Sequence, residues 1–89
     1  MKILTVCGLG QGTSLILKMN VESVLQSLGV SDADVEHTDV SSASSMNADY
    51  IITSNELAQN LEDHSAKIII VNNYFDEDEI KQALETEFS

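Results

Sequence analysis

The sequence predicts an α/β protein in which a four-stranded parallel sheet carries helices on both faces, giving three layers. Short apolar runs alternate with amphipathic helical patterns along the chain, and this alternation is typical of parallel sheets. A length of 89 residues suffices for one core, so we expect residues 1–89 to form a single domain. Apolar residues make up 43% of the chain, which argues against a disordered protein.

The first half of the chain predicts two strands joined by a long helix. Ile3–Val6 is an apolar run that opens directly into glycines, as a buried strand does. A helix is predicted from about Thr13 to Leu28, with Gly29 as its stop. Its expected buried face comprises Leu17, Val21, Val24, Leu25 and Leu28. Asp34–Asp39 predicts a second strand at a sheet edge, because apolar and polar residues alternate along it.

The second half predicts two more strands, at Tyr50–Thr53 and Lys67–Val71. Val40–Asn47 has no clear period but must cross the sheet, so we expect one helical turn or an irregular bridge there. After the third strand, Ser54 or Asn55 can cap a short helix whose apolar positions are Leu57 and Leu61.

Asp76–Glu87 predicts the last helix, with Ile80, Ala83 and Leu84 as its buried stripe. Asp76 is the expected N-cap, and Glu79 stands three residues further on, as in a capping box. The acidic run at this helix start complements the helix dipole.

Charge and cysteine content exclude several classes of function. Fifteen acidic residues against four lysines give a net charge of −11, and the chain contains no arginine. Nucleic-acid binding requires a basic footprint that is absent here, and an anionic surface is repelled by anionic lipids. No apolar run is long enough to cross a bilayer, and no signal peptide is expected, so we expect a cytoplasmic protein. A single cysteine excludes an internal disulfide and a cysteine-rich zinc site.

The candidate site is the segment that follows the first strand, Cys7-Gly8-Leu9-Gly10-Gln11-Gly12-Thr13-Ser14. Three closely spaced glycines let backbone N–H groups converge, and the following helix start adds free donors and partial positive charge. Such a cradle binds anions and stabilises the thiolate of Cys7. We therefore predict Cys7 as a nucleophile that carries a phosphoryl group. The predicted phosphoryl-binding residues are Gly8, Leu9, Gly10, Gln11, Gly12, Thr13 and Ser14.

Other glycine-loop functions fit this segment less well. A Walker loop needs a lysine before Thr13, and none is present. A dinucleotide fingerprint needs its third glycine at position 13 rather than 12, although Asp39 could mimic the ribose-binding acid, so this alternative stays open. A thiol phosphatase closes the same loop length with an arginine, where this chain has Thr13. A buried, inert cysteine at a tight turn is the remaining alternative for Cys7.

Cys7 to Ser14, read as Cys-Gly-x-Gly-x-Gly-Thr-Ser, resembles the phosphocysteine loop of enzyme IIB of the bacterial phosphoenolpyruvate-dependent sugar phosphotransferase system. Val35–Asp39 and Ala48–Leu57 resemble the ascorbate-type branch in particular. The similarity covers essentially the whole chain. It implies the fold of the lactose, cellobiose and galactitol IIB proteins, with strand order 2-1-3-4.

The resemblance also implies a relay. Enzyme IIA would donate a phosphoryl group from a phosphohistidine to Cys7, which would pass it to a sugar held by the membrane transporter IIC. L-ascorbate is the sugar that the resemblance favours, with galactitol or another sugar as alternatives. The competing function is that of a small thiol phosphatase or arsenate-reductase relative. No cofactor, metal or nucleic acid is expected, and no direct membrane insertion.

Two residues outside the loop are auxiliary candidates. His37 could orient Cys7 or shuttle a proton, or it could be an inward-facing strand histidine satisfied by hydrogen bonds. Asp39 could accept hydrogen bonds from loop amides, or serve as a turn residue. A metal site formed by Cys7, His37 and Asp39 lacks the usual ligand spacing, and His64 is assigned no role. Since the donor is anionic, we expect few carboxylates around Cys7.

Overall fold

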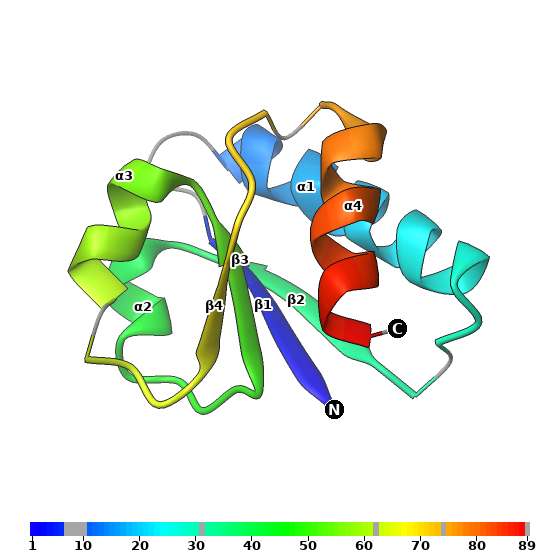
Figure 1. The fold of residues 1–89 in the computed structure, drawn as a ribbon. Helices are drawn as coiled ribbons and strands as arrows, with labels where there is room; N and C mark the ends of the chain where they lie inside the picture. Colours follow the sequence, from blue (N-terminus) through cyan, green and yellow to red (C-terminus); the bar gives the residue numbers. More distant parts are fainter. Residues whose placement is uncertain (7–10, 31, 62, 74, 89) are drawn as a thin grey trace.

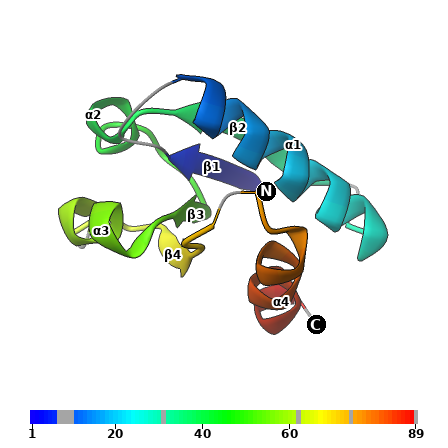
Figure 2. The same cartoon turned by 90° about the horizontal axis from the view of Figure 1, so that it is seen from above.

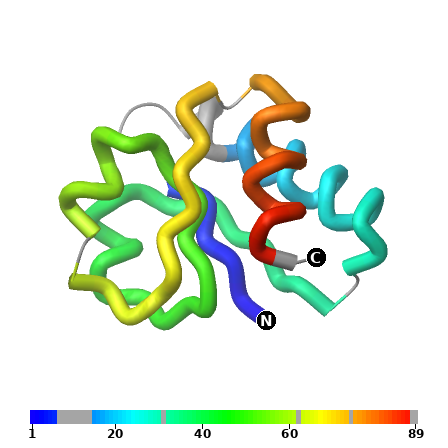
Figure 3. The backbone as a smooth tube through the Cα atoms, viewed as in Figure 1, coloured from blue at the N-terminus to red at the C-terminus, as the bar shows by residue number. Residues whose placement is uncertain are grey.

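The computed structural model describes residues 1–6, 11–30, 32–61, 63–73 and 75–88. These residues form a four-stranded parallel sheet in the order β2-β1-β3-β4, as expected. All four strands start at the same end of the molecule, so their carboxyl ends share one edge (Figure 3). The strands are β1 Lys2–Val6, β2 Asp34–Thr38, β3 Tyr50–Thr53 and β4 Lys67–Ile70.

The helices lie close to their predicted positions. They are α1 Gln11–Ser27, α2 Val40–Ala43, α3 Asn55–Ala58, the 3₁₀ turn η1 Gln59–Leu61, and α4 Glu77–Phe88. The largest difference is at α1, which begins at Gln11 rather than Thr13. Gly12 is therefore part of the helix, even though glycine lowers helix propensity.

Helices cover both faces of the sheet, α1 with α4 on one side and α2 with α3 on the other (Figures 1 and 2). Each face has its own core, because side chains alternate between the two sides of every strand. The α1/α4 core contains Ile3, Leu17, Val21, Val24, Leu25, Val35, Ile52, Ile69, Val71, Ile80 and Leu84. The α2/α3 core contains Leu4, Val6, Ala43, Ile51, Leu61 and Ala66.

The C-terminus of α1 ends in a Schellman motif. The N–H of Val30 donates to the carbonyl of Leu25 over 2.9 Å, and the N–H of Gly29 donates to the carbonyl of Gln26 over 3.1 Å. This turn needs a left-handed residue, and Gly29 has φ +79°. The predicted helix stop is confirmed, and the backbone conformation is the reason for glycine at this position.

Gly29→Ala is expected to lower the free energy of unfolding by about 1 kcal/mol, because a Cβ disfavours the left-handed conformation. A Cβ built at Gly29 meets no atom within 4 Å, so the cost is conformational rather than steric. Urea denaturation measures the change. Gly29→Asn is the control and should cost less, since asparagine tolerates this region. Equal losses for the two variants would contradict the conformational explanation.

His64, which has no role in the sequence analysis, joins three backbone groups of the α2/α3 face. Its Nδ1 accepts from the N–H of Ala66 at 2.9 Å, which places the proton on Nε2. Nε2 lies 3.0 Å from the carbonyl oxygen of Ala43 and 2.8 Å from that of Met46. The ring thus ties the segment before β4 to the end of α2, and its role is structural.

Candidate functional site

The predicted site lies where β1 leaves the sheet. β1 is an inner strand between β2 and β3. The helix that follows β1 covers one face, whereas the helix that follows β3 covers the other (Figure 2). The boundary between β1 and β3 is therefore the topological switch point of the sheet, where ligands of open α/β proteins bind.

The structure describes both ends of the predicted loop. Cys7, Gly8, Leu9 and Gly10 lie outside the described residues. They connect Val6, the last residue of β1, to Gln11, the first of α1. The other predicted phosphoryl-binding residues, Gln11, Gly12, Thr13 and Ser14, lie in the first turn of α1. The first turn of a helix presents N–H groups without intrahelical partners, and such groups bind anions.

The connections after β3 and β4 share this edge and are joined by a hydrogen bond. Ser54 is the N-cap of α3, with its Oγ accepting from the N–H of Leu57 at 3.4 Å, which confirms one of the two expected caps. The N–H of Asn55 donates to Oδ1 of Asn72, beyond β4, over 3.3 Å. The two connections are therefore held in one arrangement.

Asp76 caps α4 as expected, since its Oδ1 accepts from the N–H groups of Asp78 at 3.0 Å and Glu79 at 3.2 Å. The capping-box expectation for Glu79 is wrong, because its carboxylate does not return to the N–H of Asp76. It accepts instead from the N–H groups of Asn72 at 2.8 Å and Asn73 at 3.0 Å. The N–H of Asp76 donates to the carbonyl of Asn73. Glu79 therefore holds the connection that follows β4.

The two auxiliary candidates lie at the end of β2. His37 pairs with Thr5 of β1 in the strand register, and its side chain is exposed. The inward-facing, buried alternative for His37 is therefore wrong, because β2 is an edge strand and His37 lies near its open end. Asp39 is the N-cap of α2, with its Oδ1 accepting from the N–H of Ser42 at 2.7 Å. Its described role is that of a turn and cap residue.

Hydrogen bonds from the backbone N–H and the side chain of Ser42 lower the pKa of Asp39 below its usual value. A depressed pKa means that the carboxylate stabilises the fold above the unfolded-state pKa, and that this contribution is lost as the pH falls through the folded-state pKa. Asp39→Asn, which keeps a capping oxygen, should remove this acid-sensitive contribution. The difference in unfolding free energy between wild type and variant is expected to shrink below about pH 4. A difference that stays constant during acid titration would contradict this.

Acidic residues are unevenly distributed along the chain. All fifteen follow Val21, so the segment that contains β1, the predicted loop and the first half of α1 has none. Lys2, Lys67 and Lys81 form ion pairs with Glu36, Glu87 and Glu85. Among the described residues, no carboxylate pairs with the remaining lysine, Lys18. Cys7 lies outside the described residues, so the expectation of few carboxylates around it stays a prediction.

The same half of α1 has an exposed apolar face. Leu15, Ile16 and Met19 are 43%, 37% and 59% exposed, and they follow directly on the predicted loop. Leu15 and Met19 are four residues apart, so they lie on one side of the helix. With Lys18 this surface, called the α1 face below, combines apolar contact area with one positive charge.

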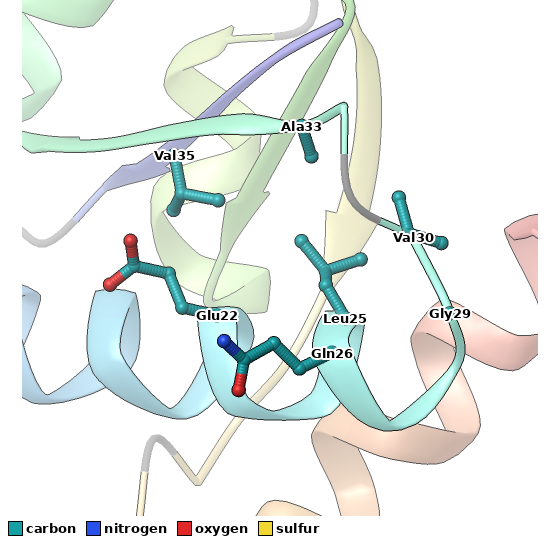
Figure 4. A pocket seen from close by; sticks show the side chains of 7 residues that line it. All are labelled: Glu22, Leu25, Gln26, Gly29, Val30, Ala33 and Val35. Atoms are coloured by element: carbon teal, nitrogen blue, oxygen red, sulfur yellow. The ribbon is translucent and has the colours of Figure 1, made fainter.

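A hollow of about 350 Å³ lies at the other end of α1, between its last turns and β2 (Figure 4). Leu25 and Val35 contribute its buried walls, and the exposed side chains of Glu22 and Gln26 flank it. At 1.5 Å per residue, Leu25 is roughly 20 Å along the helix from Gln11. The described lining of the hollow contains none of the predicted site residues and includes Gly29 and Val30 of the Schellman turn.

Within the described parts of the chain, no helix combines the length and the hydropathy needed to cross a bilayer.

The fold is thus an open α/β sheet in which β1, the strand that precedes the glycine-rich segment in sequence, ends at the switch point. The family described as "PTS system, Lactose/Cellobiose specific IIB subunit" matches residues 2–86, and the chain belongs to this family. It is therefore a IIB phosphoryl carrier of the phosphotransferase system, a phosphotransferase whose partners are IIA and IIC components. The resemblance stated from the sequence is confirmed.

Two similar proteins agree with this assignment. An "Ascorbate-specific PTS system EIIB component" of Mycoplasma pneumoniae is 41% identical over 85 residues, covering 92% of this chain and 88% of the relative. The solved structure of the lactose-specific IIB component domain from Streptococcus pneumoniae matches with a TM-score of 0.68. That match covers 100% of this chain and 98% of the other at 15% identity, so it supports the fold alone.

Proposed function

We propose that this protein is a cytoplasmic phosphocysteine carrier in which Cys7 accepts a phosphoryl group from a phosphohistidine of IIA. It then delivers the group to a sugar bound by IIC. The observation that carries the proposal is that β1 ends with Val6 at the switch point and α1 begins at Gln11. In the sequence, Cys7 therefore follows β1 directly and lies four residues before the N–H groups at the start of α1, which lack intrahelical partners. L-ascorbate is the proposed sugar, because the relative that is 41% identical is named for it.

Each transfer replaces one bond to phosphorus with another. The thiolate of Cys7 attacks the phosphorus of the donor, so an S–P bond forms while the N–P bond breaks and the histidine nitrogen keeps the electron pair. In the second step a sugar hydroxyl oxygen attacks the phosphorus. The O–P bond forms, the S–P bond breaks, the thiolate is regenerated and the hydroxyl proton leaves to solvent or a base.

The absence of arginine from the sequence favours a carrier over a hydrolase. An arginine would clamp the phosphoryl oxygens bidentately and stabilise the charge that develops during attack by water. Backbone N–H groups and the hydroxyls of Thr13 and Ser14 can hold the phosphoryl group without that clamp. The phosphocysteine then persists until an acceptor is aligned with it.

The α1 face is the proposed docking surface for the donor IIA. It follows the loop directly in sequence. Its apolar side chains are exposed, and exposed apolar patches are typical of surfaces that bind a partner protein. A phosphorylated donor is anionic, so it is repelled by most of a chain with a net charge of −11. The first 21 residues contain no acid and include Lys18, which makes this segment the favoured approach.

Intact-mass spectrometry tests the proposal after incubation with phosphoenolpyruvate, the general phosphotransferase proteins and a IIA. We expect one phosphoryl adduct on wild-type protein, and its transfer to L-ascorbate when IIC membranes are added. Rapid turnover of p-nitrophenyl phosphate would instead establish a thiol phosphatase. Transfer to galactitol but not to L-ascorbate would overturn the sugar assignment alone.

A further inference from the structure

We propose that Thr53 is a positioning residue for phosphoryl transfer, acting through the peptide group that joins Val6 to Cys7. Its hydroxyl Oγ1 donates a hydrogen bond to the carbonyl oxygen of Val6 over 3.1 Å, in a buried environment. Thr53 belongs to β3 and lies 47 residues from Val6 in sequence, across the switch point. The inference rests on the proposed function of Cys7.

Thr53 is itself held firmly. Its side chain is 0% exposed, and its carbonyl accepts from the N–H of Val71 at 2.8 Å. In the sheet it pairs with Ile70 of β4. The hydroxyl that donates to Val6 therefore belongs to an inner strand that is paired with β1 on one side and β4 on the other. This pairing restricts the position of the hydroxyl.

The contact lies next to the predicted nucleophile because Val6 is bonded directly to Cys7 in the chain. The carbonyl group of Val6 and the nitrogen of Cys7 belong to one peptide group, whose atoms are coplanar. A hydrogen bond that orients the Val6 carbonyl therefore also orients the N–H of Cys7. With glycine at positions 8, 10 and 12, the sequence of the loop imposes few backbone restrictions of its own. The start of the loop must then be set by the strand before it.

A valine at position 53 would keep the shape of threonine but remove the donor. Because the site is buried, water is poorly placed to replace the hydroxyl. Small displacements of a reacting group reduce rates strongly, so we expect Thr53→Val to slow single-turnover transfer from phospho-IIA to Cys7 about ten-fold. Half-saturation by IIA should not change, since Thr53 is not exposed to a partner. Thr53→Ser, which retains the hydroxyl, should stay within about three-fold of wild type.

Thr5→Val is the matched control. Thr5 is also 0% exposed, and its hydroxyl donates to a backbone carbonyl, that of Glu36 on β2, over 3.2 Å. The same substitution there removes a similar, part-buried hydrogen bond but leaves the Val6 carbonyl untouched. A loss of stability reduces the amplitude of adduct formation, whereas mispositioning reduces the rate constant. Circular dichroism gives the folded fraction of each variant.

Wild-type transfer kinetics in Thr53→Val, an equal defect in Thr53→Ser, or an equal defect in Thr5→Val would each overturn the inference. If Thr53→Val does not fold, Thr53→Ala is compared with Thr53→Ser in the same way. Alkylation by iodoacetamide is a second readout that needs no partner, because Cys7 is the only cysteine. Its rate should change in the valine variant but not in the serine variant. Wild-type protein that alkylates but accepts no phosphoryl group would contradict the proposed function instead.

Discussion

Cys7→Ser is expected to abolish phosphoryl acceptance from IIA, with the transfer rate falling at least about 10³-fold. The proposed nucleophile is the thiolate of Cys7, and a serine hydroxyl stays protonated at neutral pH unless a base activates it. His64 is bound to backbone groups on the α2/α3 face, so it is not available as that base. His37, exposed near the end of β2, is the histidine that remains a candidate. The measurement is intact mass after incubation with phosphorylated IIA, followed by formation of phosphorylated sugar in the presence of IIC.

Two controls make this result specific. The variant should unfold at nearly the same urea concentration as wild type, since the substitution replaces one side-chain atom by a smaller one and adds no bulk. Phosphorylated IIA mixed with the variant should keep its phosphoryl group, which shows that the donor is intact. A phosphoryl adduct of full stoichiometry on Cys7→Ser would mean that another residue is the carrier.

Met19→Asp is expected to lower the efficiency of phosphoryl transfer from IIA about ten-fold, mainly through weaker half-saturation. The change replaces an exposed apolar side chain of the α1 face with a negative charge that repels the anionic donor. Met19 is 59% exposed, so the fold should tolerate the substitution. Single-turnover rates measured against IIA concentration separate weaker docking from slower chemistry.

Gln26→Glu is the matched control, because it adds the same charge at an exposed position of α1 beside the hollow, distant from the loop. We expect wild-type kinetics for it. Equal effects at positions 19 and 26 would indicate a general effect of net charge rather than a docking face. Raising the salt concentration should reduce the defect of Met19→Asp, since exposed charges are screened.

Local chemistry made much of the fold predictable. β3 has its predicted bounds, and Gly29, Ser54 and Asp76 end or begin helices as expected. These features depend only on residues that are close in sequence. They are the apolar periodicity of strands and helices, a glycine in the left-handed conformation and side chains that cap nearby N–H groups. The α1 start was misplaced by two residues because a glycine-rich segment gives no sharp propensity signal.

The hydrogen-bond partner of a side chain, and whether a strand residue is buried, could not be predicted from spacing along the chain. Glu79 matched the spacing of a capping box, yet its carboxylate binds Asn72 and Asn73, because the connection after β4 brings their N–H groups within reach. His37 had the alternation of a buried strand residue but is exposed at the end of an edge strand. Spacing along the chain identifies which groups could meet, while packing selects among them.

The sequence by itself predicts the glycine-rich segment as the site and Cys7 as its nucleophile, and it contains no arginine that could complete a phosphatase loop. Only the tertiary structure decided that Thr53 reaches Val6 beside that cysteine and that His64 is structural. The physical reason is the separation of the interacting residues along the chain. A loop motif and the helix start beside it involve neighbouring residues, whereas the contacts of Thr53 and His64 join distant segments and depend on how the strands and helices pack. The order β2-β1-β3-β4 places β3 against β1, and so the threonine against the strand end that carries the site.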